Sequence, residues 1–357
     1  MPPTHSIVLF FLLGSIFFIG PAAIRAQSGR IKPAETPPPT RTIYVPPRTM
    51  PTPRPSTARP REVIASADGD DVIKVESTLI PIPVSVLDSS GRPLDVLTLS
   101  DFSLKIDGEP AELSELSRSE TPIRLAMLFD NSSSVLIARE FEKNAAIKFF
   151  RRVIRPEKDL AALFSVGTAT RLEQPFTKDV SSLVRAIEAF PPPIGATALL
   201  DGIVMAVDHL KDLPGRRIIV IVSDGDDTIS DFTLADALGA LQRANCQVYI
   251  VKTTDFENYV RTKSRAGNAN IRQLAAERRM KEIADQTGGA VYSPIDEKEL
   301  DAAFRQIQAE LTQQYILSYY PDPEPTKIGE FRNIELSVKG HGPVSVRTRR
   351  GYFVPRR

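Results

Sequence analysis

The chain has 357 residues, more than one average domain, and its 42% apolar and 25% charged residues are ordinary globular proportions. Its formal net charge of +1 excludes a global field that would steer it towards nucleic acid, so we expect no nucleic-acid partner. The single cysteine, Cys246, excludes an internal disulfide, so burial of an apolar core must stabilise the fold.

Residues 7–19 form the most apolar run and precede Gly20, Pro21 and a stretch of small residues that ends at Ala26. This order is typical of a signal peptide, here residues 1–26. The run is shorter than the roughly 20 residues of a membrane-spanning helix, and we see no second candidate span. We therefore expect a secreted or periplasmic protein of the cell envelope, with no membrane span in the mature chain. An uncleaved anchor is the alternative, because no Lys or Arg precedes the run.

Residues 27–61 are rich in proline, with basic residues between the prolines and few apolar clusters, as in "TMPTPRPSTARPR". Such a segment cannot bury enough apolar surface to fold, so we expect a disordered, extended linker. A ligand for a peptide-recognition domain is the alternative reading.

Residues 72–120 alternate apolar and polar side chains over short stretches, and Asp107-Gly108 indicates a hairpin. Strands with no helix between them are expected here. Pro81 and Pro83 predict that the first strand lies on an edge or carries a bulge. So few strands would be marginally stable alone, so they need partners from elsewhere in the chain.

Residues 121–312 alternate continuous apolar strands with amphipathic helices, which predicts an α/β fold with a doubly wound, mostly parallel, Rossmann-like sheet. The expected strands cover residues 123–130, 159–166, 169–176, 216–223, 247–253 and 288–293, and the expected helices cover residues 135–152, 180–190, 199–210, 234–245, 271–286 and 297–311.

From residue 313 to residue 357 the strand pattern returns, as in "YILSYYPD" and "FRNIELSVKG". We expect these strands to pair with those of residues 72–120 in one small all-β, sandwich-like unit. The α/β domain would then be inserted in that unit or flanked by it. Independent C-terminal hairpins are the alternative.

Polar side chains stand where the expected strands end. Asp130 closes "IRLAMLFD", Ser132 and Ser134 follow it, Thr197 lies in the loop "IGATALL", and Asp224 follows "IIVIVS". Carboxyl ends of parallel strands converge on one rim, so three hydroxyls and two carboxylates would meet there. Such hard oxygen ligands suit Mg²⁺ and leave a position for an external carboxylate or phosphate. Alone, the Asp-x-Ser-x-Ser pattern is weak, because these residues also cap helices.

The segment from residue 123 to residue 311 resembles a von Willebrand factor type A domain. "DNSSS", Thr197 and Asp224 are similar to that family's metal-ion-dependent adhesion site. The resemblance implies that Ser132, Ser134 and Thr197 bind Mg²⁺, or Mn²⁺ or Ca²⁺, through their hydroxyls, and that Asp130 and Asp224 bind it directly or through water. It also implies a partner protein that offers an acidic side chain to the metal.

The sequence departs from the family's common pattern at two positions, Ser133 and Ala196, where glycine is frequent. Neither change removes a ligand, although both should stiffen the loops. The flanking strands resemble those of a bacterial family of secreted proteins with related domains. Residues 253–272 are expected to form a loop on the same rim, where Arg261, Lys263 and Arg265 would frame an acidic partner or simply be solvated.

The expected function is metal-dependent protein binding or adhesion outside the cytoplasm, with no catalytic residues and no bound organic cofactor. A structural envelope component with a vestigial metal site is one alternative. A Mg²⁺-dependent phosphoryl-transfer enzyme is another, because an aspartate that ends a first strand can be a nucleophile. Position 132 is serine, however, and the sequence has no phosphate loop, zinc-ligand spacing or nucleophile elbow.

Overall fold

A computed structural model of the chain describes residues 79–118, 121–264, 270–321 and 328–354. The expected signal peptide (1–26), the proline-rich linker (27–61) and residues 72–78 lie outside the described residues. Among the helices that are described, none combines the length and the apolar character that crossing a bilayer requires.

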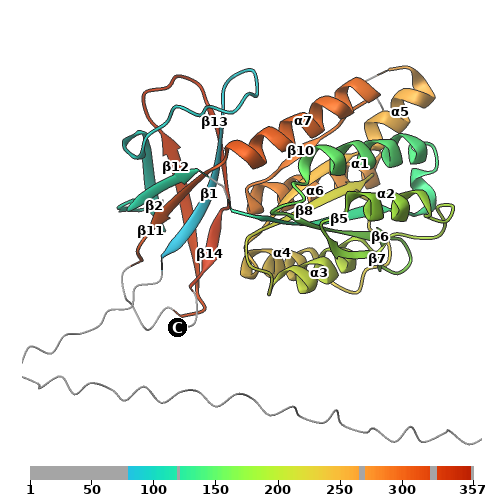
Figure 1. Cartoon of the computed structure of the whole chain (residues 1–357), viewed down its shortest axis with the longest axis horizontal. Coiled ribbons are helices and arrows are strands. Elements are labelled where there is room, and N and C mark those ends of the chain that lie inside the picture. Colours follow the sequence, from blue (N-terminus) through green and yellow to red (C-terminus); the bar gives the residue numbers. More distant parts are fainter. Residues whose placement is uncertain (1–78, 119–120, 265–269, 322–327, 355–357) are drawn as a thin grey trace, which may run out of the picture. The chain divides into compact units, whose positions relative to one another are not determined.

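A six-stranded sheet forms the centre of the α/β part, in the order β10-β9-β8-β5-β6-β7 (Figure 1). All neighbouring strands run parallel except β7, which pairs antiparallel with β6. The mostly parallel α/β fold is therefore confirmed. The strands are β5 (Ile123–Asp130), β6 (Leu160–Val166), β7 (Arg171–Thr177), β8 (Arg216–Ser223), β9 (Cys246–Lys252) and β10 (Ala290–Tyr292).

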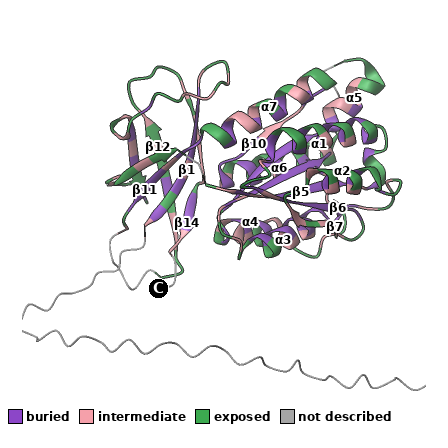
Figure 2. Cartoon of the chain, in the orientation of Figure 1, coloured by how far each residue is buried: buried purple, intermediate pink, exposed green. Residues whose placement is uncertain are grey.

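Helices cover both faces of this sheet, and the alternation of side chains along β5 explains how. Leu125, Met127 and Phe129 point into the core under α1, α2 and α7, whereas Ala126 and Leu128 point into the core under α3, α4 and α6. Buried residues accordingly follow the strands and the inner sides of the helices (Figure 2). The helices are α1 (Arg139–Val153), α2 (Val180–Glu188), α3 (Leu199–Leu210), α4 (Leu234–Arg243), α5 (Thr254–Thr262), α6 (Ile271–Thr287) and α7 (Glu297–Gln313).

Two elements of the α/β part differ from the sequence prediction. A short 3₁₀ turn, η2 (Ser133–Val135), precedes α1, so the helix begins four residues later than expected. Helix α5 occupies the first half of the segment predicted to be a loop, and it ends at Lys263 in the left-handed conformation. The ring of Phe256 stacks on that of Phe141 in α1, with centroids 3.9 Å apart, so packing on α1 stabilises a helix that its own sequence pattern does not indicate.

The flanking segments form two four-stranded antiparallel sheets around a shared apolar core that includes Ile82, Leu104, Leu317 and Ile334. In each sheet, strands that precede the α/β part pair with strands that follow it, which places the α/β part as an insertion. One sheet has the order β13-β1-β11-β4, with β13 (Ser345–Thr348), β1 (Ile80–Leu87), β11 (Tyr315–Tyr319) and β4 (Glu115–Arg118); the other has the order β14-β12-β2-β3, with β14 (Gly351–Phe353), β12 (Phe331–Val338), β2 (Phe102–Ile106) and β3 (Glu109–Ala111).

Strand β1 lies between two other strands although it contains two prolines, and its pairing pattern explains how. Up to Pro83, β1 pairs only with β11, and its pairing with β13 begins at Val84. The carbonyl oxygens of Pro81 and Pro83 accept hydrogen bonds from the side chains of Arg349 and Thr348 at 2.7 and 2.9 Å. The first half of the strand is thus an edge, where a missing N–H is tolerated.

Asp159 fixes the start of the central strand. Its buried carboxylate accepts hydrogen bonds from the backbone amide of Ile123 at 2.8 Å and from the amide and guanidinium of Arg155 at 2.8–3.0 Å. Burial alone would raise the pKa of Asp159, but these hydrogen bonds outweigh it and hold the pKa below its usual range. The carboxylate therefore stabilises the fold at pH values above about 4, and this contribution is lost as the pH falls through the lowered pKa.

We expect Asp159→Asn to lower the free energy of unfolding by about 2 kcal/mol at pH 7, because a charge-assisted network loses its charge. The loss should shrink below about pH 3, where the parent carboxylate becomes protonated. Urea denaturation at the two pH values measures this. Asp208→Asn, which removes an exposed carboxylate beside Lys211, is the control and should leave the free energy of unfolding nearly unchanged.

Candidate functional site

Asp130 ends β5 and anchors the first loop of the rim. One of its carboxylate oxygens accepts a hydrogen bond from the backbone amide of Ser132 at 2.9 Å, and the other accepts one from the hydroxyl of Ser223, at the end of β8, at 2.5 Å. The hydroxyls of Ser132 and Ser134 lie 2.8 Å apart. The turn η2 is what brings both serine hydroxyls to the side of the aspartate.

The second loop, residues 191–198, is hydrogen-bonded to the first. Ser133 donates its amide to the carbonyl of Gly195 at 3.1 Å, and Gly195 donates its own amide to the hydroxyl of Ser133 at 2.9 Å. Gly195 has a φ of +85°, and a Cβ there would lie 2.4 Å from the hydroxyl of Thr168, so glycine is required. Ser133, at the position where glycine is common in the family, therefore holds the two loops together.

Thr197 connects the second loop to the third, residues 224–230. Its carbonyl accepts a hydrogen bond from the amide of Thr228 at 2.8 Å, and its own amide donates to the hydroxyl of Thr228 at 3.1 Å. Its side chain is buried, but within the described residues no hydrogen bond joins its hydroxyl to the other four predicted ligands. Asp227 caps α3 by accepting from the amides of Leu199 and Leu200, which fixes the same two loops.

The carboxylates of Asp130 and Asp224 are both buried and lie close enough to repel each other when ionised. Burial raises the pKa of Asp130 to about 7, and the charge of Asp224 adds to this effect, while the hydrogen bonds of Ser223 and Ser132 oppose it. Burial also raises the pKa of Asp224, and the amide of Asp226 and the nearby Ser134 hydroxyl oppose that rise. The structure thus gathers Asp130, Ser132, Ser134 and Asp224 and places Thr197 on the loop between them.

Two further acidic residues, Glu142 on α1 and Glu257 on α5, lie close to this centre. Burial and then the charge of Asp130 raise the pKa of Glu142 well above its usual value, and the nearby Thr253 hydroxyl opposes that rise. Burial and then the charge of Asp224 raise the pKa of Glu257 to about 8. The sequence did offer one signal: Glu142 shares a helix face with Ala145, Ala146 and Phe149, which are core positions.

The donor set fits a divalent cation bound through hydroxyls as well as carboxylates. In the part of the chain that the structure describes, no three His, Cys, Asp or Glu side chains lie close enough to hold a metal by themselves. The serine hydroxyls are therefore needed to complete a set of oxygen ligands. Burial and then the repulsion between neighbouring carboxylates raise the pKa values of Asp130 and Glu142, and a cation at this rim would offset the cost of keeping these groups ionised.

The residues expected to frame an acidic partner are only partly described. Arg261 lies 3.8 Å from Glu257 in an ion pair, and Lys263 lies over the ring of Tyr259. Arg265 lies outside the described residues. Their role in framing a partner stays a prediction.

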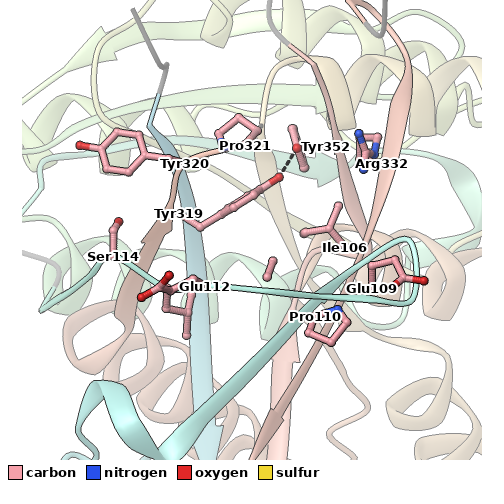
Figure 3. Close-up of a pocket in the computed structure, with 12 residues that line it drawn as sticks. Ile106, Glu109, Pro110, Glu112, Ser114, Tyr319, Tyr320, Pro321, Arg332 and Tyr352 are labelled. Atoms are coloured by element: carbon pink, nitrogen blue, oxygen red, sulfur yellow. Dashed lines mark hydrogen bonds between the residues drawn. The ribbon is translucent and has the colours of Figure 1, made fainter. Parts of the chain in front are cut away.

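A cavity of about 400 Å³ lies away from the rim, in the flanking β sheets (Figure 3). Part of its polar lining is already paired, since the hydroxyls of Tyr319 and Tyr352 hydrogen-bond to each other and Arg332 is paired with Asp107. Its position and chemistry do not connect it with the rim.

Comparison with known families identifies the α/β part. Residues 125–226 match the sequence model of the family described as von Willebrand factor type A domain. The chain contains a von Willebrand factor type A domain. The matched stretch spans all five predicted ligands, Asp130, Ser132, Ser134, Thr197 and Asp224. No curated protein matches the sequence.

Solved structures with similar architecture come from several kinds of protein. The PilB minor pilin from Streptococcus sanguinis is 12% identical, with 55% of this chain and 62% of that chain covered and a TM-score of 0.42, so the match spans less than two thirds of the pilin. BatB, a conserved hypothetical protein from Bacteroides thetaiotaomicron, is 14% identical, with 53% and 98% covered and a TM-score of 0.41. Proximal thread matrix protein 1 from the mussel byssus is 14% identical, with 58% and 51% covered and a TM-score of 0.44. At this level the likeness says nothing about function.

Proposed function

We propose that this is a secreted or periplasmic protein whose von Willebrand factor type A domain holds one divalent cation at the rim and binds a partner protein through it. Mg²⁺ fits best, with Mn²⁺ or Ca²⁺ as substitutes. Such a domain indicates protein–protein interaction or adhesion. When bound, the cation supplies a Lewis-acid position that accepts an acidic side chain of the partner.

The observation that carries the proposal is the pair of buried carboxylates, Asp130 and Asp224, beside the hydroxyls of Ser132 and Ser134. Within the described residues neither carboxylate forms an ion pair with Lys or Arg. Burying like charges without a counter-charge is costly, and a divalent cation would offset that cost. Hydrogen bonds among the three loops hold these groups in place before any cation arrives, which reduces the entropy lost on binding.

The alternatives have less support. Both oxygens of the Asp130 carboxylate already accept hydrogen bonds, and Ser132 stands where a second catalytic carboxylate would be needed for phosphoryl transfer. Of the two described histidines, His209 contacts Met205 on α3 and His341 lies beside Asp101, both away from the rim. A structural component with a vestigial site is distinguished by titration.

Isothermal titration of the full chain with MgCl₂ and MnCl₂ tests the proposal. We expect one cation per chain, and Thr197→Val should weaken binding about tenfold or more by removing one hydroxyl ligand. Thr312→Val, which removes a hydroxyl bonded within α7, is the matched control and should bind as the parent does. A parent chain that gives no heat and no gain in thermal stability with either metal would support the structural alternative.

A further inference from the structure

The rim carries exposed large apolar side chains as well as its polar centre. Leu136 is 65% exposed, Ile194 is 76% exposed and Ile271 is 86% exposed. Most of the exposed large apolar residues of the described chain lie on loops or helices at this end of the domain. We call the following residues the apolar collar: Leu136, Ile137, Ile194, Ile229, Phe232, Val260, Ile271 and Leu274.

Hydrogen bonds and chain position place Leu136, Ile194, Ile229 and Ile271 of the collar beside the candidate metal centre. The amide of Ile194 donates to the carbonyl of Asn131 at 3.0 Å, and the amide of Ile229 donates to the carbonyl of Thr197 at 3.3 Å. Next to Ile271, the guanidinium of Arg272 donates to Asp226 at 3.0 Å. Leu136 follows directly after the turn that carries Ser134. The collar side chains therefore come from the loops that hold the centre and from helices α5 and α6.

Exposed apolar side chains concentrated on one face mark interaction sites. Here they lie beside the oxygen ligands that we propose hold the cation. A partner that covers the collar therefore also removes water from the cation. Coulombic attraction between a cation and a carboxylate strengthens in such a water-poor environment. An aliphatic collar with a charged centre complements a segment that is apolar on both sides of one carboxylate.

We infer that the rim is a docking surface for a protein segment in which one Asp or Glu is flanked on both sides by large aliphatic or aromatic side chains. This inference rests on the proposed function, because the acidic residue binds at the cation while its neighbours cover the collar. A lipid surface fits less well, since Arg272 and Arg261 are already paired with Asp226 and Glu257 instead of being free for anionic headgroups.

The test is a displayed library of nonapeptides with a fixed central Glu and four random residues on each side, selected on the full chain in MgCl₂ and eluted with EDTA. We expect enrichment of Ile, Leu, Val, Phe and Met on both sides of the Glu. A triple variant, Leu136→Ser, Ile194→Ser and Ile271→Ser, should keep the need for Glu and Mg²⁺ but lose the flank preference. Fluorescence polarisation should show at least about tenfold weaker binding of an enriched peptide to it.

The substituted side chains are exposed, so the triple variant should keep the parent's circular dichroism and cation affinity. Val96→Ser with Ile328→Ser removes exposed apolar side chains from the segments that connect the flanking β strands and should leave selection unchanged. Selection that needs Glu and Mg²⁺ but shows no flank preference overturns the inference and leaves the proposed function standing. Selection that needs neither Glu nor Mg²⁺ overturns both.

Three other outcomes would also contradict the inference. They are the absence of any enrichment, Mg²⁺-dependent dimerisation in light scattering that the triple variant abolishes, and collar-dependent sedimentation with phosphatidylserine vesicles. Cation titration of the same preparation judges the proposed function separately in each case.

Discussion

Asp130→Asn is expected to reduce the affinity for Mg²⁺ by about a hundredfold or more. The change removes one of two carboxylates from the donor set but is nearly isosteric, so the amide oxygen can still accept from Ser132 and the amide nitrogen can donate to Ser223. Isothermal titration with MgCl₂ measures the effect. Asp285→Asn is the control, because it removes an exposed carboxylate that pairs with Lys281 on α6, and it should leave affinity unchanged.

Thermal melts separate loss of a ligand from loss of the fold. In EDTA, Asp130→Asn should melt at or above the temperature of the parent, because burial and the charge of Asp224 disfavour the ionised form of Asp130. At a Mg²⁺ concentration about 100 times the parent's dissociation constant, the parent should gain about 2.7 kcal/mol and the variant little. A variant that is less stable than the parent in EDTA, or that gains as much from Mg²⁺, would count against a cation at Asp130.

The position of these residues could be predicted because it follows from topology. Once β5 and β8 are parallel neighbours, Asp130 and Asp224 must lie at the same rim, whatever the details of packing. The alternation along β5 likewise required helices on both faces, and the sheet has them. These features depend on strand direction and side-chain period, which local sequence specifies.

Other features depend on contacts between distant segments, which one sequence does not reveal. Helix α5 depends on the stacking of Phe256 on Phe141, and the same packing buries Glu142 and Glu257 near the rim. The position of β1 between β11 and β13 depends on which residues of these strands pair with each other. The two prolines of β1 indicate only that part of the strand is an edge. Thr197 shows the limit for the site. Its place just before α3 follows from the sequence, but whether its hydroxyl reaches the other four residues depends on packing between the loops.

Glu310→Ala should lower the free energy of unfolding by about 3–5 kcal/mol. Glu310 lies on α7 with its side chain fully buried, and its carboxylate accepts hydrogen bonds from Arg347 of β13 at 2.7 Å and from the hydroxyl of Tyr292 at 2.8 Å. Its removal leaves a half-buried guanidinium without its counter-charge. Asp301→Ala on the same helix removes a more exposed carboxylate paired with Arg152 and Arg305 and should cost about 1 kcal/mol or less.

The Glu310 pair also bears on how the two folded parts melt. Close to it, Arg216 of β8 donates to the carbonyl of Leu311 at 2.6 Å and to the side chain of Gln314, and Gln314 donates to Ser85 of β1 at 3.1 Å. Polar groups buried between the α/β part and the β sheets are costly to expose separately, so the parent should unfold in one transition by calorimetry.

Glu310→Leu with Arg347→Leu should recover part of the stability lost in Glu310→Ala, because no unpaired charge remains. No recovery in the double variant would mean that the loss in Glu310→Ala comes from packing of α7 and not from a stranded guanidinium.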